Sequence, residues 1–337
     1  MDHPGSAGVL RRRAFVALLG AAALRPRFAL GQRSERTPRV GVLMSGLASD
    51  PAARASLAAF AQALAASGWR DGQNLRLDYR WAADAEQFGR QAAQLIASKP
   101  ELIVAFTSTA LVAVAREHAA VPVVVVGVAD PVEQGFAASL AHPGGAMTGI
   151  VSYQFSIGSK WLGLLGTLEP SLARIAVLMN PEMSPEAGFF TRSVKAGAAS
   201  LAMDVVAAPV GDAAGVEPAF AKLAAQPQGG MIVPDSAFLQ RNRARIVELA
   251  SRYRLPAIYA SRDFVAAGGL MSYGVAAQNS FAAAASYVDR ILKGAAPGEL
   301  AIQGPGKFRL AINRKAANGL GLAIPPALLA HADEVIE

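Results

Sequence analysis

Polar side chains follow the apolar segments of this 337-residue chain with a regularity that indicates binding chemistry. Serine and threonine offer hydroxyls and, at the start of a helix, backbone N–H groups that bind a carboxylate. An aspartate holds an ammonium group, and a tyrosine supplies an apolar wall with a polar tip. Such residues follow strand-like segments at Ser45, Gly46, Thr107, Ser108, Thr109, Asp130, Asn180, Asp235, Tyr259 and Tyr273. In open parallel sheets, ligands bind at the carboxyl ends of the strands, so these residues are the candidate ligand contacts.

Each candidate also has a structural role open to it. Thr107, Ser108 and Thr109 could cap the next helix, a role compatible with anion binding at the same place. Proline follows Asp130 and Asn180, as it does in turns. The remaining alternatives are an ordinary loop at Ser45 and Gly46, a helix cap at Asp235, and core packing at Tyr259 and Tyr273. The sequence leaves all of these open.

Recognisable catalytic motifs are missing from the sequence. It contains no Gly-x-Ser-x-Gly and no Gly-x-x-x-x-Gly-Lys-Ser/Thr phosphate loop, and Met44-Ser45-Gly46-Leu47 lacks the further glycines of a dinucleotide fingerprint. The absence of cysteine excludes disulfides, thiolate metal sites and cysteine nucleophiles. The four histidines have no metal-like spacing. We therefore expect a binding protein that is not an enzyme and that uses no cofactor and no metal.

Short apolar strands and alanine-rich helices alternate along the chain and would position the candidate residues. Continuous Val/Ile/Leu runs are typical of parallel strands buried on both faces. The first series has strands at 39–44, 75–81 (alternating, as in an edge strand), 102–106, 121–128 and 148–152, and helices at 52–67, 85–97, 110–117 and 134–140. The second has strands at 174–179, 205–209, 230–233, 256–259, 270–273 and 308–312, and helices at 159–168, 186–202, 217–225, 242–253, 263–266, 278–293 and 314–319.

The second series begins as the first does, because RIAVLM at 174–179 repeats the composition and place of RVGVLM at 39–44. Alternating strands and helices predict parallel sheets with helices on both faces and right-handed crossovers. The expected fold is therefore α/β, with two doubly wound, Rossmann-like parallel-sheet lobes.

The first 31 residues have the organisation of an export signal. Arg12 and Arg13 precede Phe15 in a twin-arginine-like arrangement, an apolar run at 14–24 is too short to span a bilayer, and small residues precede Gln32. We expect cleavage near Gly31/Gln32 and a periplasmic protein. A basic leader or an uncleaved anchor is the alternative.

The positive charge of the chain is concentrated in this leader. Residues 1–31 hold five arginines and one acid, so the remainder has a net charge of about +3 instead of +7. Arg241, Arg243 and Arg245 resemble a solvated helix face, and a nucleic-acid reader would cluster its basic residues more strongly. We therefore expect no nucleic-acid partner.

Motifs along residues 39–337 resemble one known family, the substrate-binding proteins of ABC transporters that include binding proteins for tryptophan and other aromatic amino acids. Each motif is weak alone, and their order over the whole length is specific. The motifs are VGVL at 40–43, GWRDGQN at 68–74, DPV at 130–132, SLA at 139–141 with PGG at 143–145, TG at 148–149, GGLMSYG at 268–274, YVDRILKG at 287–294 and GLAIPP at 321–326.

The resemblance implies a type I periplasmic-binding fold, in which two lobes close on a small ligand about a hinge of several strands. The lobes would comprise residues 32–150 with 276–302, and 151–275 with 303–337, with the hinge near 148–152, 270–274 and 303–307. It also implies a monomer that delivers an amino acid or similar ligand to an ABC permease and its ATPase. An exported sensory protein and, less favoured, an exported hydrolase using the same cleft are the alternatives.

Overall fold

The computed structural model describes residues 37–118, 120–275, 277–304 and 307–337. The predicted export signal at 1–31 lies outside the described residues. Contacts group residues 38–337 into one compact unit. Within the described part of the chain, no helix combines the length and the apolar character needed to cross a bilayer.

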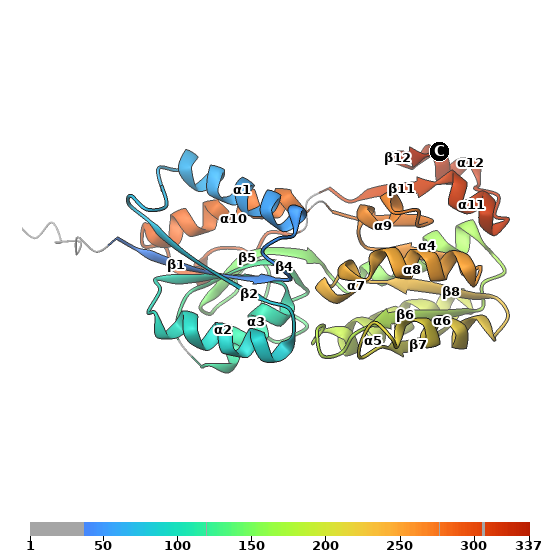
Figure 1. Cartoon of the computed structure of the whole chain (residues 1–337), viewed down its shortest axis with the longest axis horizontal. Coiled ribbons are helices and arrows are strands. Elements are labelled where there is room, and N and C mark those ends of the chain that lie inside the picture. The colour runs from blue at the N-terminus through green and yellow to red at the C-terminus, as the bar shows by residue number, and fades with distance from the viewer. Residues whose placement is uncertain (1–36, 119, 276, 305–306) are drawn as a thin grey trace, which may run out of the picture. The chain divides into compact units, whose positions relative to one another are not determined.

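The first of two sheets in the described residues has the strand order β2-β1-β3-β4-β5, with all neighbours parallel (Figure 1). Its strands are β1 (Arg39–Ser45), β2 (Arg76–Ala82), β3 (Leu102–Phe106), β4 (Val123–Ala129) and β5 (Met147–Tyr153). Helices α1 (Pro51–Ala66), α2 (Ala85–Ala97), α3 (Ser108–Arg116) and α10 (Ala277–Leu292) pack on it. The predicted edge strand is confirmed, since β2 lies at one end of the order.

Burial on both faces explains the apolar runs of this sheet. In β1, Val40 and Val42 join a core cluster that includes Phe60 of α1 and Phe281 of α10. Leu43 points the other way, into a cluster with α2 and α3. Helices therefore cover both faces, as the doubly wound arrangement predicts.

The second sheet has the order β12-β11-β10-β9-β8-β6-β7, with β10 and β11 antiparallel and the other neighbours parallel. Its strands are β6 (Arg174–Met179), β7 (Asp204–Pro209), β8 (Gly229–Val233), β9 (Ala257–Tyr259), β10 (Met271–Gly274), β11 (Arg309–Asn313) and β12 (Glu334–Ile336). Its helices are α4 (Ile157–Leu168), α5 (Ala187–Ala198), α6 (Val216–Ala224), α7 (Ala237–Arg241), α8 (Arg243–Arg252), α9 (Arg262–Ala266), α11 (Arg314–Leu320) and α12 (Pro326–Ala330). The short 3-10 helix η1 (Ala199–Leu201) follows α5, and η2 (Pro297–Glu299) contacts β5 of the first sheet.

The repeated apolar hexapeptides occupy equivalent strands. β1 lies between β2 and β3, and β6 lies between β7 and β8. The predicted α/β fold with two parallel-strand sheets is thereby confirmed, with the antiparallel β10–β11 pair as an addition to it.

The chain passes from one sheet to the other after β5, again after β10, and once more before β11. Before the last crossing, the Gln303 amide donates to the Gly149 carbonyl at 2.9 Å, and the Val151 amide donates to the Gln303 carbonyl at 3.1 Å. Thr148 Oγ1 also donates to the Leu300 carbonyl at 2.7 Å. The hinge expected near 148–152, 270–274 and 303–307 and the lobe boundaries stay predictions.

A few local elements differ from those expected. The helix predicted at 134–140 is wrong, because residues 131–135 form turns in which Gly135 has a φ of 79°. Asp130 holds this turn through its carboxylate, which accepts a hydrogen bond from the Glu133 amide. α7, α12 and β12 were not expected, since segments of three to five residues carry little periodicity.

Candidate functional site

The carboxyl end of β1 lies beside the start of α3 in the first sheet. Ser45 Oγ and Thr107 Oγ1 are 3.4 Å apart. Gly46 continues the chain with a φ of 92°, and its amide donates to the Ala82 carbonyl at 2.8 Å. These contacts join the ends of β1, β2 and β3 at one edge of the sheet.

Thr107 takes an unusual backbone conformation for a threonine, with a φ of 82°, and its side chain does not cap α3. The hydroxyls of the next two residues are buried and already bonded within the protein. Ser108 Oγ lies 3.4 Å from the Ala129 amide nitrogen and 3.4 Å from Gln134 Nε2. Thr109 Oγ1 donates to the Met183 carbonyl at 2.8 Å. The helix start therefore offers a ligand its backbone N–H groups more readily than these two hydroxyls.

Asp130 is engaged by the backbone around it. One carboxylate oxygen accepts from the Phe155 amide at 3.0 Å and the other from the Glu133 amide at 3.3 Å. Its φ is 35°, and only 6% of the residue is exposed. Asp130 thus fixes the path from β4 and β5 into α4.

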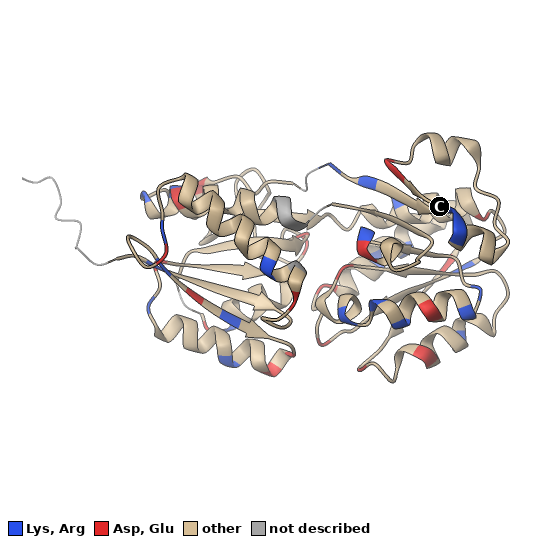
Figure 2. Cartoon of the chain, turned by 45° about the horizontal axis from the view of Figure 1, so that its top comes forward, with Lys and Arg blue, Asp and Glu red and all other residues tan. Residues whose placement is uncertain are grey.

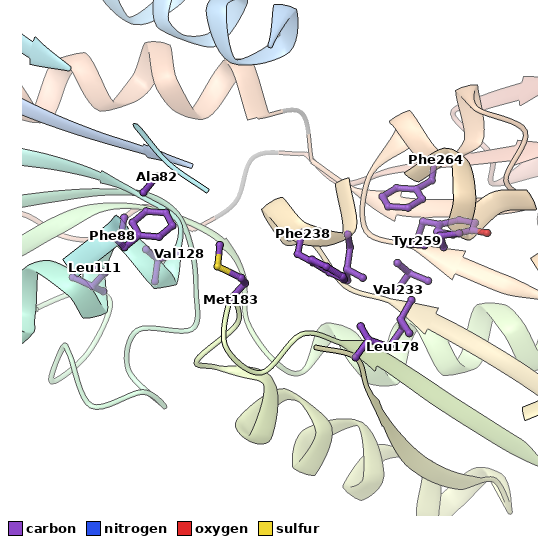
Figure 3. Close-up of a cluster of buried hydrophobic side chains, with 14 of the residues drawn as sticks. Ala82, Phe88, Leu111, Val128, Leu178, Met183, Val233, Phe238, Tyr259 and Phe264 are labelled. Carbon is purple, nitrogen blue, oxygen red and sulfur yellow. The ribbon is translucent and has the colours of Figure 1, made fainter. Parts of the chain in front are cut away.

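Asn180 plays a comparable part at the end of β6. Its Nδ2 donates to the Gly211 carbonyl at 2.8 Å, and its Oδ1 accepts from the Met183 amide at 2.9 Å. These bonds hold the loop between β6 and α5. Figure 3 shows Met183 of that loop lying between Val128 of β4 and Phe238 of α7, within one cluster of buried side chains.

The same loop carries Glu186, a residue that the sequence reasoning did not select. Glu186 is 8% exposed, and its Oε2 has no hydrogen-bond partner among the described residues. The pKa of its carboxyl is raised to about 7. Burial is the largest cause and the nearby Asp235 adds to it, whereas hydrogen bonding from its own amide and from Ser108 lowers this pKa. Ser108 at the start of α3 therefore influences the carboxyl of a residue on the loop after β6.

Asp235 follows β8 and lines two small cavities. The first has a volume of about 10 Å³ and is lined by Tyr153, Leu178, Met179, Ser184, Glu186, Ala187, Phe190, Pro234, Asp235 and Leu239. The second has a volume of about 20 Å³ and is lined by Ser152, Tyr153, Trp161, Asp235, Ala260, Tyr273, Gly274, Val275 and Phe308. Asp235 keeps an exposed surface, yet the surrounding protein desolvates its carboxyl and raises its pKa, against a bond from Gln240 that lowers it.

The two predicted tyrosines lie in different surroundings. Tyr259 is fully buried and stacks on Phe264 with ring centroids 4.7 Å apart, and burial raises the pKa of its hydroxyl (Figure 3). Tyr273 stacks on Phe308 at 5.2 Å, and its carbonyl accepts a hydrogen bond from Trp161 Nε1 at 2.9 Å. Tyr273 lines the second cavity, and Tyr259 lines neither.

Tyr153, Ser184 and Glu186 are lining residues that sequence reasoning missed. Tyr153 is the last residue of β5, so the strand-end rule would have found it had the strand not been predicted to end at Ser152. Burial raises the pKa of its hydroxyl, and the charges of Glu186 and Asp235 raise it further. Glu186 gave no comparable signal, because it lies at the far end of the loop after β6.

The charge distribution away from the cavities is mixed. Basic and acidic residues are interspersed along the ribbon (Figure 2). On α8, Arg245 and Arg252 form ion pairs with Glu217 of α6 and with Glu248. Among the described residues, no group of three or more histidine, cysteine, aspartate and glutamate side chains could hold a metal ion.

The two lobes, each with a sheet of mainly parallel strands, have a periplasmic-binding-protein fold of type I, and solved structures share it. A crystal structure of a conserved domain protein from Vibrio cholerae has a TM-score of 0.80 at 26% identity, covering 89% of this chain and 100% of that one. A domain from Streptococcus pneumoniae in complex with L-Trp has a TM-score of 0.79 at 22% identity, with coverage of 89% and 100%.

The sequence itself places the chain in a family. The family model described as ABC transporter substrate binding protein matches residues 40–336, so the chain belongs to that family. A curated relative, the tyrosine-binding protein of Clostridioides difficile (strain R20291), is 24% identical over 290 residues, covering 86% of this chain and 82% of the relative. The resemblance inferred from the sequence motifs is confirmed.

Proposed function

We propose that this protein is the extracytoplasmic binding component of an ABC importer and that it captures an aromatic amino acid. The observation that carries the proposal is the meeting of Glu186 and Asp235 beside an aromatic wall at the strand ends of the second sheet. The tyrosine-binding relative and the L-Trp complex of a structural neighbour support this ligand class.

The two cavities suit the two ends of such a ligand. The first brings together carboxyl groups that can hold an ammonium group, and the second is walled by Trp161, Tyr273 and Phe308. Asp235 and Tyr153 line both cavities, so the polar and aromatic regions adjoin. We assign the ammonium group to the first and the ring to the second.

A ligand carboxylate needs hydrogen-bond donors as well, because a desolvated charge without a partner is costly. We assign it to the N–H groups at the start of α3, at Ser108 and Thr109, with Ser45, Gly46 and Thr107 beside them. Helix N-termini bind anions, and here no side chain from Thr107 caps the helix. In this assignment Asp130 and Asn180 hold loops and Tyr259 packs in the core, whereas Asp235 and Tyr273 contact the ligand.

Ligand access requires movement. The cavities, about 10 and 20 Å³ in volume, each hold no more than about one water molecule, so an amino acid can enter only if the walls separate. We propose that the crossings after β5, after β10 and before β11 form the hinge of that movement. The domain assignment stays 32–150 with 276–302 and 151–275 with 303–337, as proposed from the sequence.

The cellular setting is part of the same proposal. Residues 1–31 would direct export to the periplasm, and the monomeric binding protein would deliver its ligand to a permease and its ATPase. The ligand would leave unaltered, which distinguishes this function from an exported hydrolase.

A thermal-shift screen of the twenty amino acids, simple sugars and nucleosides tests the ligand class. A ligand that binds only the folded state raises the melting temperature. We expect L-Tyr, L-Trp or L-Phe to give the largest rise, and mass spectrometry to recover the compound unchanged after incubation. A rise with sugars alone, or recovery of a converted product, would contradict the proposal.

A further inference from the structure

Glu186 is a buried carboxyl whose surroundings leave one oxygen unused. The residue is 92% buried, and Oε2 has no hydrogen-bond partner among the described residues. Ser108, at the start of α3, acts on the same carboxyl and lowers its pKa. A buried polar atom without a partner costs about 1–3 kcal/mol, so the free oxygen is a place where a ligand donor would bind with little competition.

The groups that face Glu186 are acidic or neutral. Asp235 approaches it from the loop after β8, Tyr153 from the end of β5, and Ser184 from its own loop. Asp263 acts in turn on Asp235 from α9. Among the described residues that line either cavity, none is lysine, arginine or histidine. Two carboxyl groups thus line one cavity whose described lining residues supply no cation.

We propose that Glu186 and Asp235 act together as a two-carboxyl clamp for the ligand ammonium group, with Glu186 Oε2 accepting one of its N–H bonds. The proposal rests on the function proposed above and names the residue that selects an amine. The ammonium group takes the place of a proton on Glu186, and that proton passes to solvent.

Affinity therefore depends on pH in a defined direction. Burial places the pKa of Glu186 at about 7 in the free protein, and a bound cation lowers it. Below pH 7 the free protein carries the proton that must leave, so affinity for the amine falls by up to about tenfold for each pH unit. Above pH 7 the carboxylate is already formed, and the affinity levels off.

Isothermal titration calorimetry tests this with whichever of L-Tyr, L-Trp and L-Phe gives the largest thermal shift. Titrations run between about pH 5.5 and 8.5 in buffers of different ionisation enthalpy, which count the protons released by the unmodified protein. We expect release of about half a proton at pH 7 and a dissociation constant at least tenfold higher at pH 5.5 than at pH 7.5.

Glu186→Gln provides the second measurement, with Glu182→Gln as its matched control on the same loop. Glu182 is exposed and lines neither cavity. We expect Glu186→Gln to weaken binding at least tenfold at pH 7.5. Its affinity should equal that of the parent protein near pH 5.5 and should not depend on pH. Glu182→Gln should bind the ligand with the affinity of the parent protein at every pH.

A deaminated analogue, 3-(4-hydroxyphenyl)propanoate, completes the set and should bind at least tenfold more weakly than L-Tyr. Amino-acid binding with no proton release and equal affinity in Glu186→Gln would overturn this inference and leave the proposed function standing. Absence of any amino-acid binding to the parent protein would overturn both. The proton count needs no variant, so a folding defect in Glu186→Gln would not obscure the result.

Discussion

Thr109 Oγ1 donates a 2.8 Å hydrogen bond to the main-chain carbonyl of Met183, so α3 on the first sheet is tied to the loop between β6 and α5 of the second. Both residues are buried, and Met183 is itself fixed by Asn180 Oδ1. The bond holds Glu186, three residues beyond Met183, close to Ser108.

Thr109→Val keeps the shape of the side chain and removes this bond. The buried Met183 carbonyl then loses a donor, which costs about 1–3 kcal/mol. We expect a lower free energy of unfolding in urea and weaker ligand binding in calorimetry. Ser67→Ala, which removes the hydrogen bond of an exposed hydroxyl just after α1, should change neither the free energy of unfolding nor the binding free energy by more than about 0.5 kcal/mol. Unchanged stability and affinity in Thr109→Val would show that this hydrogen bond contributes to neither.

Asp235→Ala is expected to weaken binding of an amine-bearing ligand by tenfold or more, because the ammonium group loses a charged partner. Asp204→Asn is the control, since Asp204 pairs with Arg174 at the opposite, amino-terminal edge of the sheet. Calorimetry at pH 7.5 measures both. Equal affinity of Asp235→Ala and the parent protein would remove Asp235 from the site.

Tyr273→Ala should weaken binding of an aromatic ligand by about five- to tenfold, because a stacked aromatic wall is lost from the second cavity. Tyr273→Phe keeps the ring and should bind within about twofold of the parent protein. Titrations with L-Trp and L-Ala separate the ring contribution, and a similar loss for both amino acids would argue against a ring-binding role.

The stability of the ligand-free protein should fall as pH rises from about 5 to 7.5. The folded protein keeps a proton on Glu186 up to about pH 7, whereas the unfolded chain releases it near 4.5, so the folded state binds more protons in this window. The cost of holding the carboxylate in the folded state above pH 7 is about 3 kcal/mol. Glu186→Gln should flatten this part of the profile, measured by urea unfolding at each pH. An identical profile in the variant would place the proton elsewhere.

Gly149→Ala should destabilise the protein severely. Gly149 has a φ of 136° in β5, and a Cβ there would lie 2.2 Å from the Val125 carbonyl oxygen. We expect a loss of several kcal/mol or failure to accumulate as folded protein. Gly163→Ala in α4 meets nothing within 4 Å and should instead stabilise by about 0.5–1 kcal/mol. Thermal melts of the two variants should therefore shift in opposite directions.

The amino-acid sequence by itself determined the two sheets and most of their strands. Apolar runs such as 39–44 and 174–179 report burial on both faces, and this burial is a local property that periodicity reveals. The strand-end rule brought Asp235 and Tyr273 forward as candidates, and both line the cavities. The ordered motifs along the chain also identified the family.

Only the tertiary structure decided which strand-end groups meet and which are already engaged. Asp130 and Asn180 look as available in the sequence as Asp235, yet backbone amides and carbonyls occupy their side chains. Glu186 has no distinguishing neighbours in sequence, because its buried environment comes from Ser108, Tyr153 and Asp235, which lie on other elements. Desolvation and pairing depend on atoms brought together from distant parts of the chain, so no local pattern could report them.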